Sequence, residues 1–134
     1  MSEIIIESDR ILLSKLFSEK PLFISDIIWV YEKMDQDMVL IPPVPLMRHH
    51  KVVICSFNPD DMKLHFDEVP INHSQCADSI KAIAQVAPWA EIGWDEGKAK
   101  QLKKAPEAFV TQVIKRRNVI IEQFNKIANQ QPAA

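Results

Sequence analysis

The chain has 134 residues, of which 47% are hydrophobic and 25% are charged, and its formal net charge is −2. This length and composition are those of an ordinary soluble globular domain. Neither of the two glycines stands in a G-x-G-x-x-G or G-x-x-x-x-G-K frame, which argues against glycine-rich phosphate loops. Two cysteines are too few for a disulfide framework.

The N-terminal segment MSEIIIE lacks the basic and long apolar regions of a signal peptide, and no apolar run approaches the ~20 residues that cross a bilayer. We therefore expect a cytoplasmic protein with no membrane partner, folded as a single domain over residues 1–134. Charge is uneven, with a balance of −6 over residues 1–93 and +4 over residues 94–134. We expect an α+β body over 1–88 and a basic C-terminal helical arm over 89–130. The basic arm suggests an acidic partner, and a solvated helix face is the alternative.

Helices are expected in the first third of the chain. Ser8 and Asp9 precede ILLSKLF, whose apolar residues have helical spacing, and Pro21 ends that run, so we expect a helix over about 8–19. Residues 22–34 fit a helix or a strand, and a possible N-cap at Ser25 and Asp26 favours the helix. A short edge strand over 38–41 and an extended segment through prolines 42, 43 and 45 should follow.

A β-hairpin is the clearest predicted element. Residues 51–57 and 62–66 flank NPDD, which has the composition of a turn. A four-residue loop at 58–61 would place Phe57 opposite Met62 and Cys55 opposite Leu64. Because strand side chains alternate, one face would be apolar and the other mixed. We therefore expect a small antiparallel sheet with helices on one side.

Three helices are expected after the hairpin. Asn72 or Ser74 can cap a helix over about 75–87, and Asp95 can cap a short helix over 96–104. Pro106 suits the first turn of a last helix over about 106–129, so the chain should end in a helical hairpin. The last helix has a broad apolar stripe that should face the core or a partner: Phe109, Val110, Val113, Ile114, Ile120, Ile121, Phe124, Ile127 and Ala128.

Spacing argues against a metal site and against an enzyme. The candidate ligands fit no zinc signature, and the predicted hairpin directs Cys55 and His65 to opposite faces; the candidates are His49, His50, Cys55, His65, His73 and Cys76. Cys55 and Cys76 lie in apolar patterns typical of buried thiols. Because no acid–base pair converges, we expect no catalytic residues, metal or cofactor.

Two basic stretches are candidate binding sites. RHHK, formed by Arg48, His49, His50 and Lys51, could hold an anion or could be a polar lead-in to a strand. The 98–117 segment could bind nucleic acid with Trp89 and Trp94 as stacking platforms. The acidic chain and the absence of a nucleic-acid-binding motif argue against that partner.

The stretch WDEGKAKQLKKAPEAFV, with the following KRRN and EQF, resembles the small C-terminal helical domain of light-independent protochlorophyllide reductase B subunits. Six residues fall on or near that family's pattern: Trp94, Leu102, Pro106, Phe109, Val110 and Arg116. Thr111 stands where the family has an arginine. The resemblance covers residues 94–126 and implies a helical hairpin, which in that family helps to cover a tetrapyrrole site. The iron–sulfur and catalytic parts of those enzymes have no counterpart in this chain.

These patterns favour a small non-enzymatic protein that binds another protein, such as an adaptor, a chaperone or an accessory subunit. A homo-oligomer is a further possibility. Aromatic residues and arginine are favoured at interfaces, and the predicted contact residues are Trp89, Trp94, Lys103, Lys104, Phe109, Arg116, Arg117 and Phe124. The alternatives are a small-ligand carrier or accessory protein, with a tetrapyrrole or another planar ring held between Trp94, Phe109 and RHHK, and a protein that binds nucleic acid through residues 98–117.

Overall fold

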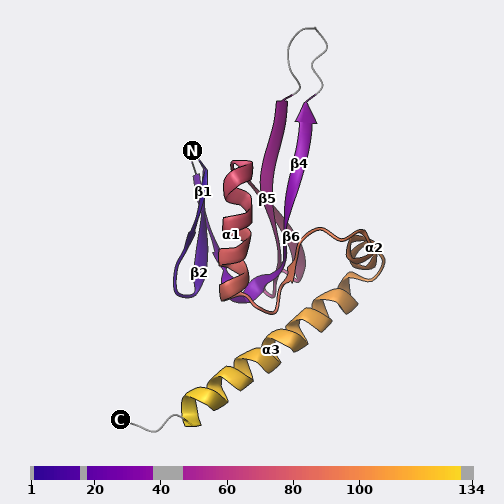
Figure 1. Cartoon of the computed structure of the whole chain (residues 1–134). Coiled ribbons are helices and arrows are strands. Elements are labelled where there is room, and N and C mark those ends of the chain that lie inside the picture. Colours follow the sequence, from indigo (N-terminus) through magenta and orange to yellow (C-terminus); the bar gives the residue numbers. More distant parts are fainter. Residues whose placement is uncertain (1, 16–17, 38–46, 131–134) are drawn as a thin grey trace.

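The structure is a computed structural model that describes residues 2–15, 18–37 and 47–130. It has an α+β fold with two sheets and a long C-terminal helix (Figure 1). The elements are β1 (Glu3–Ile6), β2 (Arg10–Lys15), β3 (Ser18–Phe23), the 3-10 turn η1 (Ile24–Asp26), β4 (Ile27–Asp37), β5 (Met47–Asn58), β6 (Lys63–Pro70), α1 (His73–Val86), β7 (Glu91–Ile92), α2 (Glu96–Lys104) and α3 (Pro106–Gln130).

The first sheet corrects the helix that the sequence predicts over residues 8–19. Strands β1, β2 and β3 form an antiparallel meander in this region. Ile11 and Leu13 are buried while their neighbours in β2 are less so, which is the two-residue alternation of a strand. The apolar run is too short to separate helical from strand spacing, and Pro21 lies within β3.

The second sheet has the order β6-β5-β4-β7, and it corrects the helix favoured over residues 22–34. Residues 22 and 23 end β3, residues 24–26 form the short turn η1, and residues 27–34 belong to the long strand β4. Ile27, Ile28, Trp29 and Val30 are all buried, so both faces of β4 are covered. A strand covered on both faces has no polar alternation, which is why its sequence also fits a helical stripe. The strand and proline segment expected over residues 38–45 lie outside the described residues.

The predicted hairpin is confirmed as β5 and β6, but its register differs by two residues. Phe57 pairs with Leu64 and Cys55 with Phe66, because the loop lies one residue later than expected. A two-residue shift keeps the side chains on the same faces. The expected contrast between the faces is wrong for β5, where Val52 and Ile54 are as buried as Val53 and Cys55.

The two faces of the four-stranded sheet have different covers. Helix α1 packs on one face and lies between the two sheets in Figure 1. A 2.7 Å ion pair between Lys20 of β3 and Asp67 of β6 links the two sheets. The other face carries Trp29 and Tyr31 and meets the chain from β7 to α3. The sequence predicts helices on one side of the sheet only. In the structure, both faces of the four-stranded sheet are covered.

The three predicted helices are confirmed. Asn72 occupies the N-cap position of α1, although its side chain makes no capping hydrogen bond. Asp95 caps α2 by accepting a hydrogen bond from the Lys98 amide, and Pro106 opens α3. Helices α2 and α3 pack together as the expected C-terminal hairpin. Among the described residues, no helix combines the length and the apolar character needed to cross a membrane.

Candidate functional site: the C-terminal arm and its apolar groove

A turn at Gly93 positions the C-terminal arm against the sheet. Strand β7 pairs in parallel with β4, and the Gly93 amide donates a 2.8 Å hydrogen bond to the Val30 carbonyl. In return, the indole Nε1 of Trp29 donates to the Gly93 carbonyl at 2.8 Å. Gly93 has φ +87°, a conformation that other residues rarely adopt. The chain therefore reverses at Gly93 and brings Trp94 back over the sheet.

Trp94 completes an aromatic cluster on this face. Its ring stacks on Trp29 at a centroid distance of 5.6 Å and meets the edge of Tyr31 at 5.1 Å. Phe109 of α3 lies 6.1 Å from Trp29 on the buried side. Trp94 remains 56% exposed, so the cluster has a buried base and an accessible outer ring.

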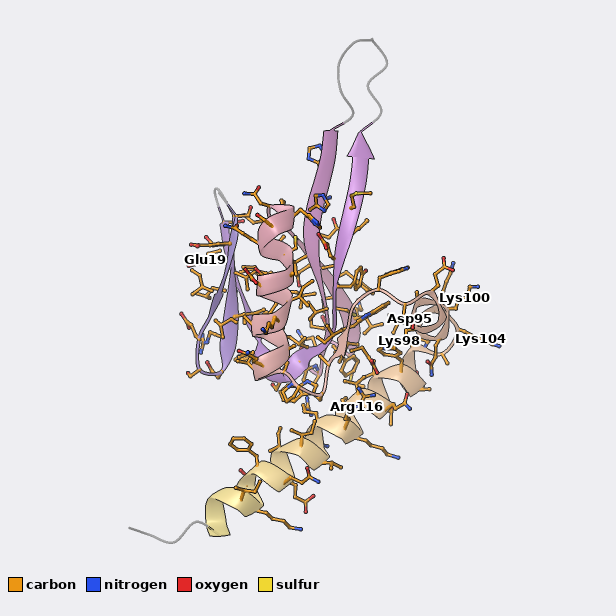
Figure 2. The ribbon with its side chains drawn as sticks, viewed as in Figure 1. Glu19, Asp95, Lys98, Lys100, Lys104 and Arg116 are labelled. Carbon is orange, nitrogen blue, oxygen red and sulfur yellow. The ribbon has the colours of Figure 1, made fainter. Side chains whose placement is uncertain are left out.

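A charged network holds the arm in place. Glu91 of β7 accepts from Lys98 Nζ at 2.6 Å and from Arg116 at 2.9 Å, and Arg116 also donates to the Trp89 carbonyl at 3.1 Å. Partial burial tends to raise the pKa of Glu91, but the two cationic donors outweigh it and lower the pKa below its usual value. In Figure 2, Lys98 lies at α2 and Arg116 lies about midway along α3. Both basic residues therefore form intramolecular ion pairs with Glu91.

An apolar groove runs between the β5–β6 hairpin and the α2–α3 junction. It consists of two adjoining hollows of about 460 and 820 Å³, which share Leu64 and Pro106. Aromatic residues line the first hollow, including Trp29, Tyr31 and Trp94. The second is lined by residues of the hairpin and of the first turns of α3, among them Phe57, Met62 and Val110.

The apolar stripe of α3 continues beyond the body of the molecule. Phe109, Val110 and Val113 are buried, whereas Phe124 is 75% exposed and Ile127 is 60% exposed. All of them follow the same helical spacing, so they belong to one face of the helix. Figure 1 shows α3 running past the sheets, so the distal half of this stripe has no cover within the described residues.

The predicted contact residues divide into two groups. Trp89 is buried and donates to the Ile27 carbonyl at 2.8 Å, and Phe109 is in the core. Arg116 binds Glu91, and Arg117 donates to the Ser25 carbonyl at 2.6 Å. These four residues hold the fold together. The exposed group comprises Trp94, Lys103, Lys104 and Phe124.

The RHHK side chains whose partners the structure describes, those of His50 and Lys51, are engaged at separate places. The four residues lie inside β5 and not before it, and adjacent side chains in a strand point to opposite faces. His50 contacts Glu32 on the α1 face, whereas Lys51 pairs with Glu68. His49 lines a cavity next to His50, and the side chain of Arg48 lies outside the described part of the structure.

The candidate metal ligands are regrouped by the fold. Cys55 is buried and His65 pairs with Asp61 at 2.7 Å, so these two are separated as expected. Burial raises the pKa of the Cys55 thiol to about 12. His50 and His73 meet, however, and both contact the Glu32 carboxylate. The sequence argument considered only histidines and cysteines as ligands and so did not include Glu32, which strand alternation places on the same face as Val30.

Searches found no match for this chain among protein-family models, curated proteins or solved structures. The resemblance of residues 94–126 to protochlorophyllide reductase B subunits therefore stays a prediction.

Proposed function

We propose that this chain is a protein-binding factor whose C-terminal arm docks an amphipathic segment of another protein. The docking surface combines the distal apolar stripe of α3 with the apolar groove. The observation that carries the proposal is the exposure of Ile121, Phe124 and Ile127 on the same face that buries Phe109 and Val113. Clustered exposed apolar side chains of this kind are typical of interaction sites.

The energetics favour an occupant with an apolar face. Burial of one large apolar side chain contributes about 1.5–3 kcal/mol. Burial of three such side chains, those of Phe124, Ile127 and Trp94, would therefore contribute several kcal/mol to binding. This contribution has to exceed the entropy that the two molecules lose on association. Trp94 and Phe124 are also the residue types that dominate binding energy at interfaces.

The exposed lysines of α2 indicate that the bound segment carries acidic residues beside its apolar face. Lys103 lines the groove, and Lys100 and Lys104 extend from α2 away from the sheets in Figure 2. These three lysines are exposed and form no ion pair within the described residues. Uncompensated charges at the rim of an apolar surface steer a partner of opposite charge and fix its orientation. The occupant is therefore an amphipathic segment with acidic residues beside its apolar face.

Site-specific photo-crosslinking in the native cell tests this proposal. A photoreactive phenylalanine analogue replaces Phe124 in the full chain, and Glu122 on the opposite face of α3 is the matched control position. We expect one discrete adduct from position 124, with the cross-linked peptide carrying acidic residues, and little adduct from position 122. Adding Lys103→Glu and Lys104→Glu should reduce the adduct at least tenfold.

Three outcomes would overturn the proposal. Equal labelling from both positions would mean that the stripe has no specific partner. An adduct only with a second copy of the chain would make this face a self-association surface. An adduct unaffected by the lysine reversals would contradict the acidic flank.

A planar apolar ligand is the second candidate, favoured by the hollow of about 460 Å³ that Trp29, Tyr31 and Trp94 line. Phe109 lies behind Trp29 in the core, so it would support the ring of Trp29 and not touch the ligand. Absorbance above the protein band in freshly purified material supports this carrier function, and a colourless protein with no co-purified small molecule contradicts it.

A further inference from the structure

A cluster of two histidines and one carboxylate lies on the other face of the four-stranded sheet, away from the groove. Glu32 comes from β4, His50 from β5, and His73 is the first residue of α1. Glu32 pairs with Val52 and Met34 pairs with His50, so Glu32 and His50 are diagonal neighbours on one face. The α1 helix then begins over this point and adds His73.

The geometry of this cluster is that of a set of metal ligands. Oε1 of Glu32 lies 3.1 Å from Nδ1 of His50 and 2.7 Å from Nδ1 of His73. One donor atom from each of the three residues lies within 4.8 Å of the others, and the imidazole centroids are 4.4 Å apart. Ligands at ~2.1 Å from a tetrahedral zinc ion are separated by roughly 3.4 Å, so small side-chain movements are sufficient.

The surroundings also fit a bound ion. The Cys76 thiol, one turn after His73, is within hydrogen-bonding reach of the Glu32 carboxylate and of the Ile71 carbonyl at 3.5 Å. Partners of this kind orient the ligands of a metal site. A cavity of about 350 Å³ adjoins the cluster and is lined by both histidines, Ile71 and Asn72. It leaves room for water as a further ligand.

We propose that Glu32, His50 and His73 bind one divalent first-row transition-metal ion of the zinc class. Two imidazoles and one carboxylate suit Zn²⁺, and three protein ligands leave a coordination position open toward the cavity. The ion joins β4, β5 and α1, which come from distant parts of the sequence. It therefore ties the start of α1 to the sheet, independently of the C-terminal arm and of any protein partner.

Metal titration of the full chain tests this site. The chain is first stripped with a chelator and then titrated with Zn²⁺ by calorimetry and with Co²⁺ by visible absorption. We expect one ion per chain, visible bands typical of low-coordinate Co²⁺, and a higher Tm with Zn²⁺ because the ion binds only the folded chain. Glu32→Gln and His73→Gln should each weaken Zn²⁺ binding by at least about tenfold.

The controls separate this site from loss of folding and from surface histidines. His73 is largely exposed, so His73→Gln should keep the far-ultraviolet circular dichroism of the wild type. His65 lies with Asp61 beside the β5–β6 turn, so His65→Gln should bind Zn²⁺ like the wild type. Wild-type affinity no greater than that of His73→Gln would overturn the proposal, as would loss of binding in His65→Gln.

Discussion

The two halves of α3 carry the same sequence pattern but have different surroundings. In the proximal half, Phe109 is only 3% exposed, and it packs behind Trp29 in the core. In the distal half, Phe124 continues the same stripe and is 75% exposed. An apolar stripe shows which face of a helix will be covered, but not whether the cover is the same chain. The first half is therefore part of the core, whereas the apolar residues of the second half are exposed.

The largest expected effect separates these two halves. Phe109→Ala should lower the free energy of unfolding by about 3–5 kcal/mol, because it leaves a cavity beside Trp29. Phe124→Ala should change the free energy of unfolding by less than about 0.5 kcal/mol, because the exposed side chain of Phe124 buries little surface against the rest of the chain. Urea denaturation followed by tryptophan fluorescence measures both values. Similar losses for the two variants would show that the distal half is also part of the core.

A smaller effect should come from the network that anchors α3 to the sheet. Glu91→Gln should cost about 1–2 kcal/mol at neutral pH, allowing for the partial exposure of Arg116 and Lys98. The folded state lowers the pKa of Glu91 below its usual value of 4.5, so its stabilisation is present above that pH and is lost as pH falls further. The difference in stability between wild type and variant should therefore shrink below about pH 4.5.

Thermal unfolding of both proteins between pH 3 and pH 7 measures this difference, with Glu122→Gln on the exposed helix as the control. A constant difference across this range would mean that Glu91 does not anchor the arm as an ionised group.

The smallest effect concerns the turn that sets Trp94 over Trp29. Gly93→Ala should cost about 1 kcal/mol because the residue has φ +87°, although space for the added Cβ is free. The same change should weaken the near-ultraviolet circular dichroism of the stacked indoles. Wild-type stability together with a wild-type spectrum would show that this turn tolerates other residues and does not position Trp94.

The sequence predicts the C-terminal half of the fold well and the N-terminal half poorly. Asp95 and Pro106 are local signals that act within a helical turn, and both are found where expected. Residues 10–15 and 27–34 also follow possible capping residues, but those signals are misleading, because the apolar side chains suit either spacing and both segments are strands. Their strands are specified by pairing with distant partners, such as Trp29 with Cys55, which local patterns do not reveal.

The candidate site is predictable only in part for a related reason. Phe124 and Lys103 are recognisable from type and position alone. The roles of Trp89 and Arg116 depend on the Ile27 carbonyl and on Glu91, which the fold brings close. The cluster of Glu32, His50 and His73 depends on three elements meeting, and no sequence spacing encodes that meeting.

Native mass spectrometry of the full chain, recovered gently from its own cells, tests the central claim most directly. We expect the wild type to appear as a complex of one chain with a discrete protein partner. Phe124→Glu should appear as the free chain with an unchanged Tm, and Glu122→Ala should keep the complex. A wild type found only as free chain, or as multiples of its own mass, would contradict the account, as would a complex that survives Phe124→Glu.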